Sequence, residues 1–315
     1  MPQKLRPRFI APMPGLQRET GAWRDRLARI EDLGFDEVAI SEHYSRGWAM
    51  EPLTALAFAA ALTTRLRLLT LVLNNDIRHP AVLAKAMATV DVLSEGRVTL
   101  GIGAGWLPAD YDALGIPFES PGTRLARLEE GIGVIRAFFA GGTVQARGKH
   151  YQVTGLEALP GTVQYPNLPI LVGAGGPRML SLAGRVADIA GIHVTLGPHG
   201  FDERAARELS AASIRAKIRR VREAADAEHR PPPAFEFTPV VVIVDGDRST
   251  AVRPGFTDYI ESRPAEFADS PAVLAGTAGE VAESIHRWTE ELGIELWHLG
   301  ADIELAGRVV AAARR

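Results

Sequence analysis

The chain has 315 residues, 46% of them apolar, and a formal net charge of −3. This length supports a large buried core, and the small charge gives no reason to expect binding to nucleic acid or to an anionic membrane. The absence of cysteine excludes disulfides, thiolate metal sites and cysteine nucleophiles. No apolar run reaches the length of a membrane span, and the first residues lack the apolar core of a signal peptide. We therefore expect a cytoplasmic protein.

The first 62 residues predict two strand-and-helix units, with strands at 9–13 and 36–40 and helices at 23–33 and 52–62. The second strand runs into Glu42 and His43. A histidine at the end of a strand can donate a hydrogen bond to a ligand or act as an acid or base, although a lone histidine is more often structural. The histidines of the chain show no metal-ligand spacing, and no metal is expected.

Residues 67–106 read as strand, helix and strand. The runs 67–73 and 98–102 are apolar without polar alternation, as expected for parallel strands buried on both faces. Pro80 can open the intervening helix, with His79 as a capping or packing residue before it. Polar or glycine-rich residues follow each strand, where ligands of parallel α/β folds bind: Asn74-Asn75-Asp76 and Gly103-Ala104-Gly105.

The glycines at 101, 103 and 105 do not form a dinucleotide fingerprint, because the third glycine falls one residue early and Pro108 interrupts the expected helix start. At the end of a barrel strand they offer bare backbone that a planar ring can approach; a tight turn is the alternative interpretation. Asp76 and Arg78 are expected to pair with each other and brace their loop.

The rest of the chain continues the alternation of helices and strands. Residues 142–166 break it and predict an inserted hairpin and loop, and residues 245–271 are expected to be irregular with some helix. Thr277 and Glu280 form a capping-box pattern. The basic residues before 228, Lys217 among them, are interpreted as a solvated helix face. The remaining expected strands are 169–172, 188–192, 235–244 and 295–299, and the remaining helices are 123–139, 179–186, a long helix to about 228, 277–292 and 303–313.

Eight strands that alternate with helices favour a (β/α)8 TIM barrel over an open doubly wound sheet. We expect a single domain over residues 1–315, with residues 142–166 inserted in it. The glycine-rich run that begins at Gly173 precedes a helix and exposes backbone N–H groups beside the positive end of the helix dipole. Such a loop predicts a phosphate site, to which Arg178 could add a contact; a flexible connection is the alternative.

Taken in order, five stretches resemble the luciferase-like flavin oxidoreductase superfamily, and specifically its coenzyme F420-dependent branch. They are GFDEVAISEHY, TTRLRLLTLVLNNDIRHPAVLAKAMATVDVLSEGRVTLGIGAGW, DALGIPF, PILVGAGGPRML and GRVADIAG. The resemblance implies a (β/α)8 barrel with an insertion, a homodimer, and a flavin or deazaflavin ring at the carboxyl end of the barrel. It covers the first two-thirds of the chain well.

The resemblance also implies roles for individual residues. A non-prolyl cis peptide near Leu71 and Val72 would lie against the ring, Asn74 would contact the ring edge or ribityl chain, and His43 with Glu42 would act near the reacting centre. Glu42 stands where many deazaflavin enzymes carry Asp, a pattern also found in flavin-mononucleotide (FMN) relatives. Residues that would line the ring are Ala104, Gly105 and Trp106, and those that would hold the phosphate are Gly173, Ala174, Gly175, Gly176, Pro177, Arg178 and Met179.

The function implied is that of an oxidoreductase that moves a hydride between coenzyme F420 and a small organic substrate. One alternative is a two-component monooxygenase in which reduced FMN reacts with oxygen. Another is a flavin-binding protein without turnover.

Overall fold

The structure of the chain, a computed structural model, describes residues 5–16, 19–45, 50–164, 167–197, 202–249 and 259–315. The chain forms two compact units. Unit 1 consists of Met1–Pro14, Gly21–Val38 and Ala174–Arg315, and unit 2 consists of Gly15–Thr20 and Ala39–Gly173.

Unit 2 contains the elements between Ala39 and Gly173. Its helices are α2 (Pro52–Leu62), the short 3-10 helix η1 (Asn75–Ile77), α3 (Pro80–Leu93), α4 (Pro108–Leu114) and α5 (Pro121–Phe139). Its strands are β3 (Arg67–Thr70), β4 (Leu73–Asn74), β5 (Val98–Gly103), β6 (Thr143–Arg147) and β7 (Gln152–Glu157). β2 (Glu37–Ile40) and β8 (Ile170–Ala174) belong to both units.

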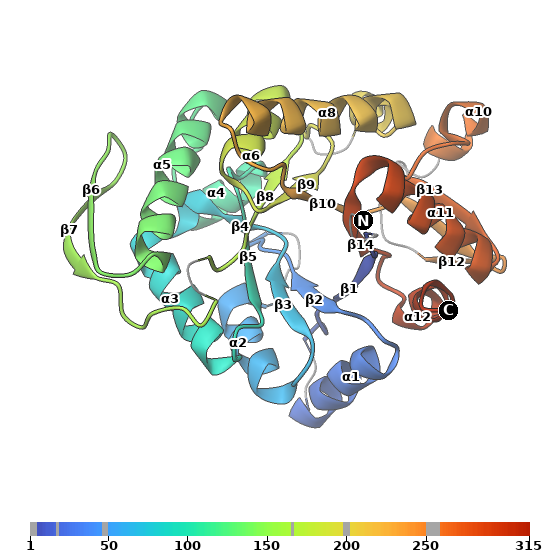
Figure 1. The fold of residues 1–315 in the computed structure, drawn as a ribbon, viewed down its shortest axis with the longest axis horizontal. Coiled ribbons are helices and arrows are strands. Elements are labelled where there is room, and N and C mark those ends of the chain that lie inside the picture. Colours follow the sequence, from blue (N-terminus) through green and yellow to red (C-terminus); the bar gives the residue numbers. More distant parts are fainter. Residues whose placement is uncertain (1–4, 17–18, 46–49, 165–166, 198–201, 250–258) are drawn as a thin grey trace. The chain divides into compact units, whose positions relative to one another are not determined.

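The helix starts of unit 2 follow from the sequence. Glu51, His79 and Ser120 each cap a helix whose next residue is proline, and each side chain accepts a backbone N–H of the first turn. The expected capping role of His79 is therefore confirmed. α3 packs on both α2 and α5, and the three helices lie along the outer side of β3, β4 and β5 (Figure 1).

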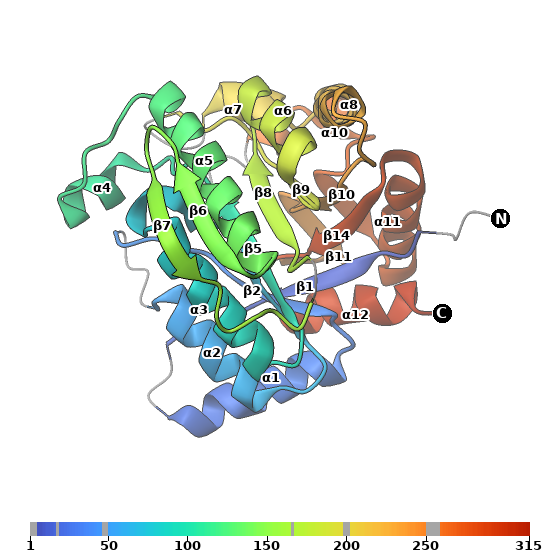
Figure 2. The ribbon, with the colours of Figure 1, turned by 60° about the vertical axis from the view of Figure 1, so that its left-hand side comes forward.

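The expected hairpin is present. β6 and β7 pair as a separate antiparallel two-stranded sheet outside the parallel sheet, and Figure 2 shows them beside α5. Residues 165 and 166 of the expected insertion lie outside the described residues.

Unit 1 carries the first strand and the last third of the chain. Its helices are α1 (Thr20–Asp32), α6 (Pro177–Val186), α7 (Glu203–Arg207), α8 (Ala211–Ala227), α10 (Pro264–Phe267), α11 (Ala278–Leu292) and α12 (Ile303–Ala313). Its strands are β1 (Arg8–Pro12), β9 (Ile189–Ile192), β10 (Ala234–Phe237), β11 (Val241–Val244), β12 (Asp247–Ser249), β13 (Val273–Gly276) and β14 (Ile294–His298). The capping box at Thr277 and Glu280 is formed as the sequence predicts.

Two expectations for unit 1 are wrong. The strand expected at 235–244 is two strands, because the chain leaves the barrel after Phe237 and β11 joins a small separate sheet in the order β12-β11-β13. The single long helix expected before 228 is α7 and α8, separated where Ser210 caps α8. Figure 1 shows the small sheet beside α11 and α12, and residues 250–258 of the region expected to be irregular lie outside the described residues.

The barrel strands pair in the order β3-β2-β1-β14-β10-β9-β8-β5, and β5 pairs in turn with β3, which closes the ring. Helices lie between successive strands, so the fold is the (β/α)8 barrel that the sequence predicts. Every residue of β2, β5 and β9 is buried, which explains why these strands lack polar alternation.

Candidate functional site

The carboxyl ends of β2, β4 and β5 in unit 2 bring together most of the predicted site residues. The expected cis peptide is present between Leu71 and Val72, where the third strand divides into β3 and β4. The predicted residues placed in or beside this cluster are Glu42, His43, Leu71, Val72, Asn74, Ala104, Gly105 and Trp106.

Glu42 positions the loop that follows β4. Its carboxylate is buried, accepts the backbone N–H of Asn74 at 2.8 Å and pairs with Arg78 at 2.5 Å. Arg78 also binds Glu51 at 2.6 Å, and the hydroxyl of Tyr44 donates to Glu42 at 3.2 Å. The expected pairing of Asp76 with Arg78 is therefore wrong, because the buried Glu42 carboxylate takes the Arg78 guanidinium. Glu42 thus acts through its neighbours and fixes the position of Asn74.

His43 is held by a carboxylate that the sequence reasoning missed. Its Nδ1 lies 2.7 Å from Asp110, which also accepts the backbone N–H groups of Tyr44 and Ser45 and the Ser45 hydroxyl. Burial alone would raise the pKa of Asp110, but the hydrogen bonds from Ser45, His43 and Tyr44 outweigh it and hold this pKa below its usual value. An ionised Asp110 accepts a proton-bearing Nδ1, which makes Nε2 of a neutral His43 the acceptor nitrogen.

Glycines let the strands approach each other under this cluster. A Cβ at Gly101 would lie 1.7 Å from the carbonyl oxygen of Thr70, and one at Gly103 would lie 3.1 Å from the Val72 side chain. Ala104, Gly105 and Trp106 follow as partly exposed residues. The Trp106 indole meets the His43 ring edge to face at a centroid distance of 5.8 Å, which restricts both rings.

A second missed residue, Tyr111, closes the cluster from α4. Its hydroxyl lies 3.2 Å from Asn74 Oδ1 and 3.1 Å from Asp76, which pairs with Arg127 at 3.1 Å. Burial and the charge of Asp76 raise the pKa of Tyr111, so the phenol stays protonated and can donate. Gly105 has a φ of +73°, and a Cβ there would lie 2.1 Å from this hydroxyl, so only glycine fits at this position.

The phosphate loop predicted from the sequence leads into α6 in unit 1. α6 begins at Pro177, two residues earlier than expected, and its N-cap is Gly176, which has no side chain to cap the first turn. The N–H groups of Arg178 and Met179 therefore have no intrahelical partner. A Cβ at Gly175 would lie 2.3 Å from the carbonyl oxygen of Val194, whereas Gly176 has no neighbour closer than 3.8 Å. The first turn of α6 has the features of an anion site.

Lys217 of α8 is buried, so the interpretation of all the α8 charges as a solvated face is wrong for this residue. Its ammonium group donates to the carbonyl oxygens of Gly175 at 3.0 Å and His193 at 2.6 Å, and it pairs with Glu208 at 2.7 Å. Lys217 thus ties the loop before α6 to the loop after β9.

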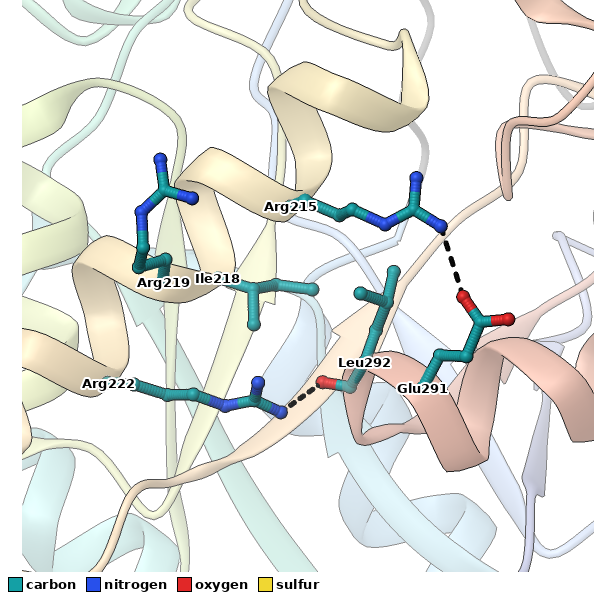
Figure 3. A pocket seen from close by; sticks show the side chains of 6 residues that line it. All are labelled: Arg215, Ile218, Arg219, Arg222, Glu291 and Leu292. Atoms are coloured by element: carbon teal, nitrogen blue, oxygen red, sulfur yellow. Dashed lines mark hydrogen bonds and ion pairs between the residues drawn. The ribbon is translucent and has the colours of Figure 1, made fainter.

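A surface hollow of about 440 Å³ lies between α8 and α11 of unit 1 (Figure 3). Its guanidinium groups already have partners. Arg215 pairs with Glu291 at 3.0 Å, Arg222 donates to the carbonyl oxygen of Leu292 at 2.6 Å, and Arg219 lies 3.8 Å from Glu223. The hollow holds none of the predicted site residues.

The sequence model of the family described as luciferase-like monooxygenase matches residues 8–293. The chain belongs to this family. Over 182 residues it is 40% identical to an F420-dependent glucose-6-phosphate dehydrogenase from Beutenbergia cavernae, which covers 54% of the chain and 52% of that relative. Over 158 residues it is 37% identical to a 5,10-methylenetetrahydromethanopterin reductase from Methanolobus tindarius, which covers 50% of the chain and 45% of that relative.

The chain thus spans about half the length of these curated relatives. Among solved structures, the monooxygenase RslO1 from Streptomyces bottropensis matches with a TM-score of 0.71 and 25% identity, over 97% of each chain. An F420-dependent secondary alcohol dehydrogenase in complex with an F420-acetone adduct matches with a TM-score of 0.73 over 99% of this chain and 100% of that one; at 18% identity this likeness shows the fold.

No helix in the described parts of the chain is both long and apolar enough to cross a bilayer.

Proposed function

We propose that this luciferase-like protein is an oxidoreductase that transfers a hydride between deazaflavin coenzyme F420 and a small organic substrate. The observation that carries the proposal is the His43–Asp110 pair, whose imidazole contacts Trp106 directly after the glycines at 103 and 105. Curated relatives that share about half of the chain are named as F420-dependent enzymes, which supports the same cofactor.

The residues of the cluster fit a planar ring that carries polar edges. Ala104 and Gly105 leave backbone partly exposed beside Trp106, and the Asn74 side chain lies next to them through Tyr111. When bound, a deazaflavin supplies the hydride chemistry, and the protein supplies position and electrostatics. In unit 1, the first turn of α6 is the proposed phosphate site, with Gly173, Ala174 and Gly175 leading into it.

The role of His43 follows from its hydrogen bond. Asp110 fixes the Nδ1–H tautomer and so leaves Nε2 to hold or move a proton near the reacting centre. Glu42 does not act on the ligand directly, because its two carboxylate oxygens bind Arg78, Tyr44 and the backbone N–H of Asn74. We assign His43 the catalytic role and Glu42 the positioning role.

A second candidate function is an FMN-dependent monooxygenase. The observation that favours it is the 25% identity to RslO1, a monooxygenase, across 97% of both chains. The two candidate functions differ in chemistry, because a deazaflavin has a carbon atom at the ring position where a flavin activates oxygen. A protein that binds a flavin without turnover is the third hypothesis.

The test uses protein reconstituted with reduced F420 and mixed, under strict anaerobiosis, with a panel of small carbonyl and unsaturated compounds. The proposal expects the absorbance of oxidised F420 to return with at least one compound. Turnover that requires both FMN and oxygen would instead establish the monooxygenase, and binding without turnover under either condition would establish the binding protein.

We further propose a cytoplasmic homodimer, as the family resemblance implies. Equilibrium sedimentation should give twice the chain mass of 33.9 kDa. A mass of one chain at micromolar concentration would contradict the dimer.

A further inference from the structure

Unit 1 contains a buried carboxyl group to which the proposed function gives no role. Glu236 in β10 has no exposed surface, and the Thr238 hydroxyl donates to its Oε1 at 3.0 Å. Its Oε2 makes no hydrogen bond to any described residue. A buried carboxylate oxygen without a hydrogen bond is costly, whereas a protonated carboxyl group at the same place is not charged and can donate.

The surroundings favour the protonated form. Burial raises the pKa of Glu236 to about 8, the hydrogen bond from Thr238 lowers it, and the charge of Glu37 raises it further. Glu37 is itself buried and pairs with Arg8 at 3.1 Å. Glu236 is therefore largely a neutral acid at neutral pH, with a proton to give.

A candidate proton acceptor close to Glu236 is His193, in the loop after β9. Its Nε2 lies 3.6 Å from Glu236 Oε2, and about a third of its side chain (36%) is exposed. Burial of part of the ring and the charge of Lys217 lower the pKa of His193, which favours the neutral imidazole that can accept a proton. The distance exceeds a hydrogen bond by about 0.5 Å, and catalytic hydrogen bonds often tighten only when ligand binds.

The backbone is built to let these two side chains meet. Gly191 lies opposite Glu236 in the β9–β10 ladder, and a Cβ there would lie 2.9 Å from His193 Nε2 and 3.0 Å from Glu236 Oε2. The main chain of His193 is fixed from both sides, since its N–H donates to the carbonyl oxygen of Ala174 at 2.9 Å and its carbonyl oxygen accepts from Lys217. His298, at the end of the neighbouring β14, is a further titratable group beside β10, and burial lowers its pKa to about 4.

We propose that Glu236 and His193 form a proton-donating pair at the carboxyl ends of β10 and β9, which protonates an oxygen atom of a bound carbonyl substrate. The use of the pair in turnover rests on the proposed hydride transfer. When a carbonyl carbon accepts a hydride, the C=O electron pair moves to oxygen, and that oxygen takes the proton from Nδ1 of His193. His193 Nε2 takes the proton of Glu236 in the same transfer, which leaves a carboxylate that regains its proton from water.

The first experiment needs no cofactor. Infrared spectra of protein with ¹³C-labelled glutamate should contain a protonated-carboxyl band at pH 7 that is absent in Glu236→Gln. In ¹⁵N-histidine NMR spectra the His193 ring, assigned by its loss in His193→Gln, should shift with a midpoint near pH 8 in the wild type, because Glu236 titrates beside it. That step should vanish in Glu236→Gln and shrink at least twofold in Gly191→Ala, whose methyl group separates the two side chains. A missing infrared band, or a His193 signal that ignores Glu236, would overturn the pair.

The second experiment measures turnover across pH with reduced F420 and the substrate found by the panel. Glu236→Gln and His193→Gln should each lower kcat at least tenfold below pH 8 and remove the alkaline fall of the wild-type profile, while the Kd for F420 stays within twofold. Unchanged pH profiles would overturn the catalytic use of the pair. If no compound reoxidises reduced F420, the proposed function fails, and the spectra alone then decide whether the pair exists.

Discussion

Replacement of Glu236 by Gln should remove a large pH dependence of folding stability. Burial raises the pKa of Glu236 to about 8 in the folded protein, against an ordinary value of 4.5 that applies to the unfolded chain. Between these two values the folded state holds a proton that the unfolded state has released. The free energy of unfolding therefore falls as pH rises through this window, by about 1.4 kcal/mol per pH unit. The loss begins near the lower value and is complete above pH 8.

Gln has the same shape as the protonated carboxyl group and does not titrate, so this contribution disappears in the variant. Between about pH 5.5 and 7.5 the wild type should lose roughly 2 to 3 kcal/mol more stability than Glu236→Gln. Urea unfolding of both proteins at each pH measures the difference, and other titrating groups cancel in the comparison. Parallel stability curves for the two proteins would show that Glu236 is ionised in the fold and would refute the reasoning.

Three further substitutions test the two units. Gly176→Asp should weaken F420 binding at least tenfold, about 1.4 kcal/mol, without destabilising the protein, because Asp is a good N-cap. Gly176→Asn, which adds a cap of the same shape without charge, is the matched control. Equal F420 affinity in the two variants would argue against an anion site. Lys217→Met should lower the free energy of unfolding by about 3 kcal/mol, because Glu208 keeps its charge and loses its cationic partner. Arg219→Met, on the exposed side of the same helix, should change the free energy of unfolding by less than about 0.5 kcal/mol; similar losses in the two variants would contradict the buried role of Lys217. Asp110→Asn should slow F420-dependent turnover at least tenfold, about 1.4 kcal/mol in the barrier, while the Kd for F420 changes by less than about threefold. Stopped-flow kinetics measure the rate and fluorescence titration measures the Kd. An equal loss of turnover rate and of cofactor affinity would indicate a structural role for Asp110.

The fold could be predicted from the sequence because its signals are local. Buried parallel strands appear as short apolar runs. Helix starts in unit 2 are indicated by a capping residue followed by proline, as at His79 and Ser120. The split of the strand expected at 235–244 was not predictable in this way. Val241–Val244 is as apolar as Ala234–Phe237, and only long-range pairing with β13 assigns it to another sheet.

The candidate site shows the same division. Glu42, His43 and Asn74 could be placed because they follow predicted strands. Asp110 was missed because Pro108 was interpreted as an interruption, whereas it starts α4 and so carries Asp110 to His43. Lys217 was missed because one buried amine in a run of basic residues has no local signature, and its burial depends on Glu208 and two carbonyl groups from distant loops.

The most direct test of the proposed function is a pair of equilibrium fluorescence titrations of the cofactor-free protein, one with oxidised F420 and one with FMN. The account predicts that F420 binds at least tenfold more tightly, and that substrate turnover with its reduced form persists in the complete absence of oxygen. Tighter binding of FMN, with activity that stops when oxygen is removed, would contradict the account and identify a monooxygenase.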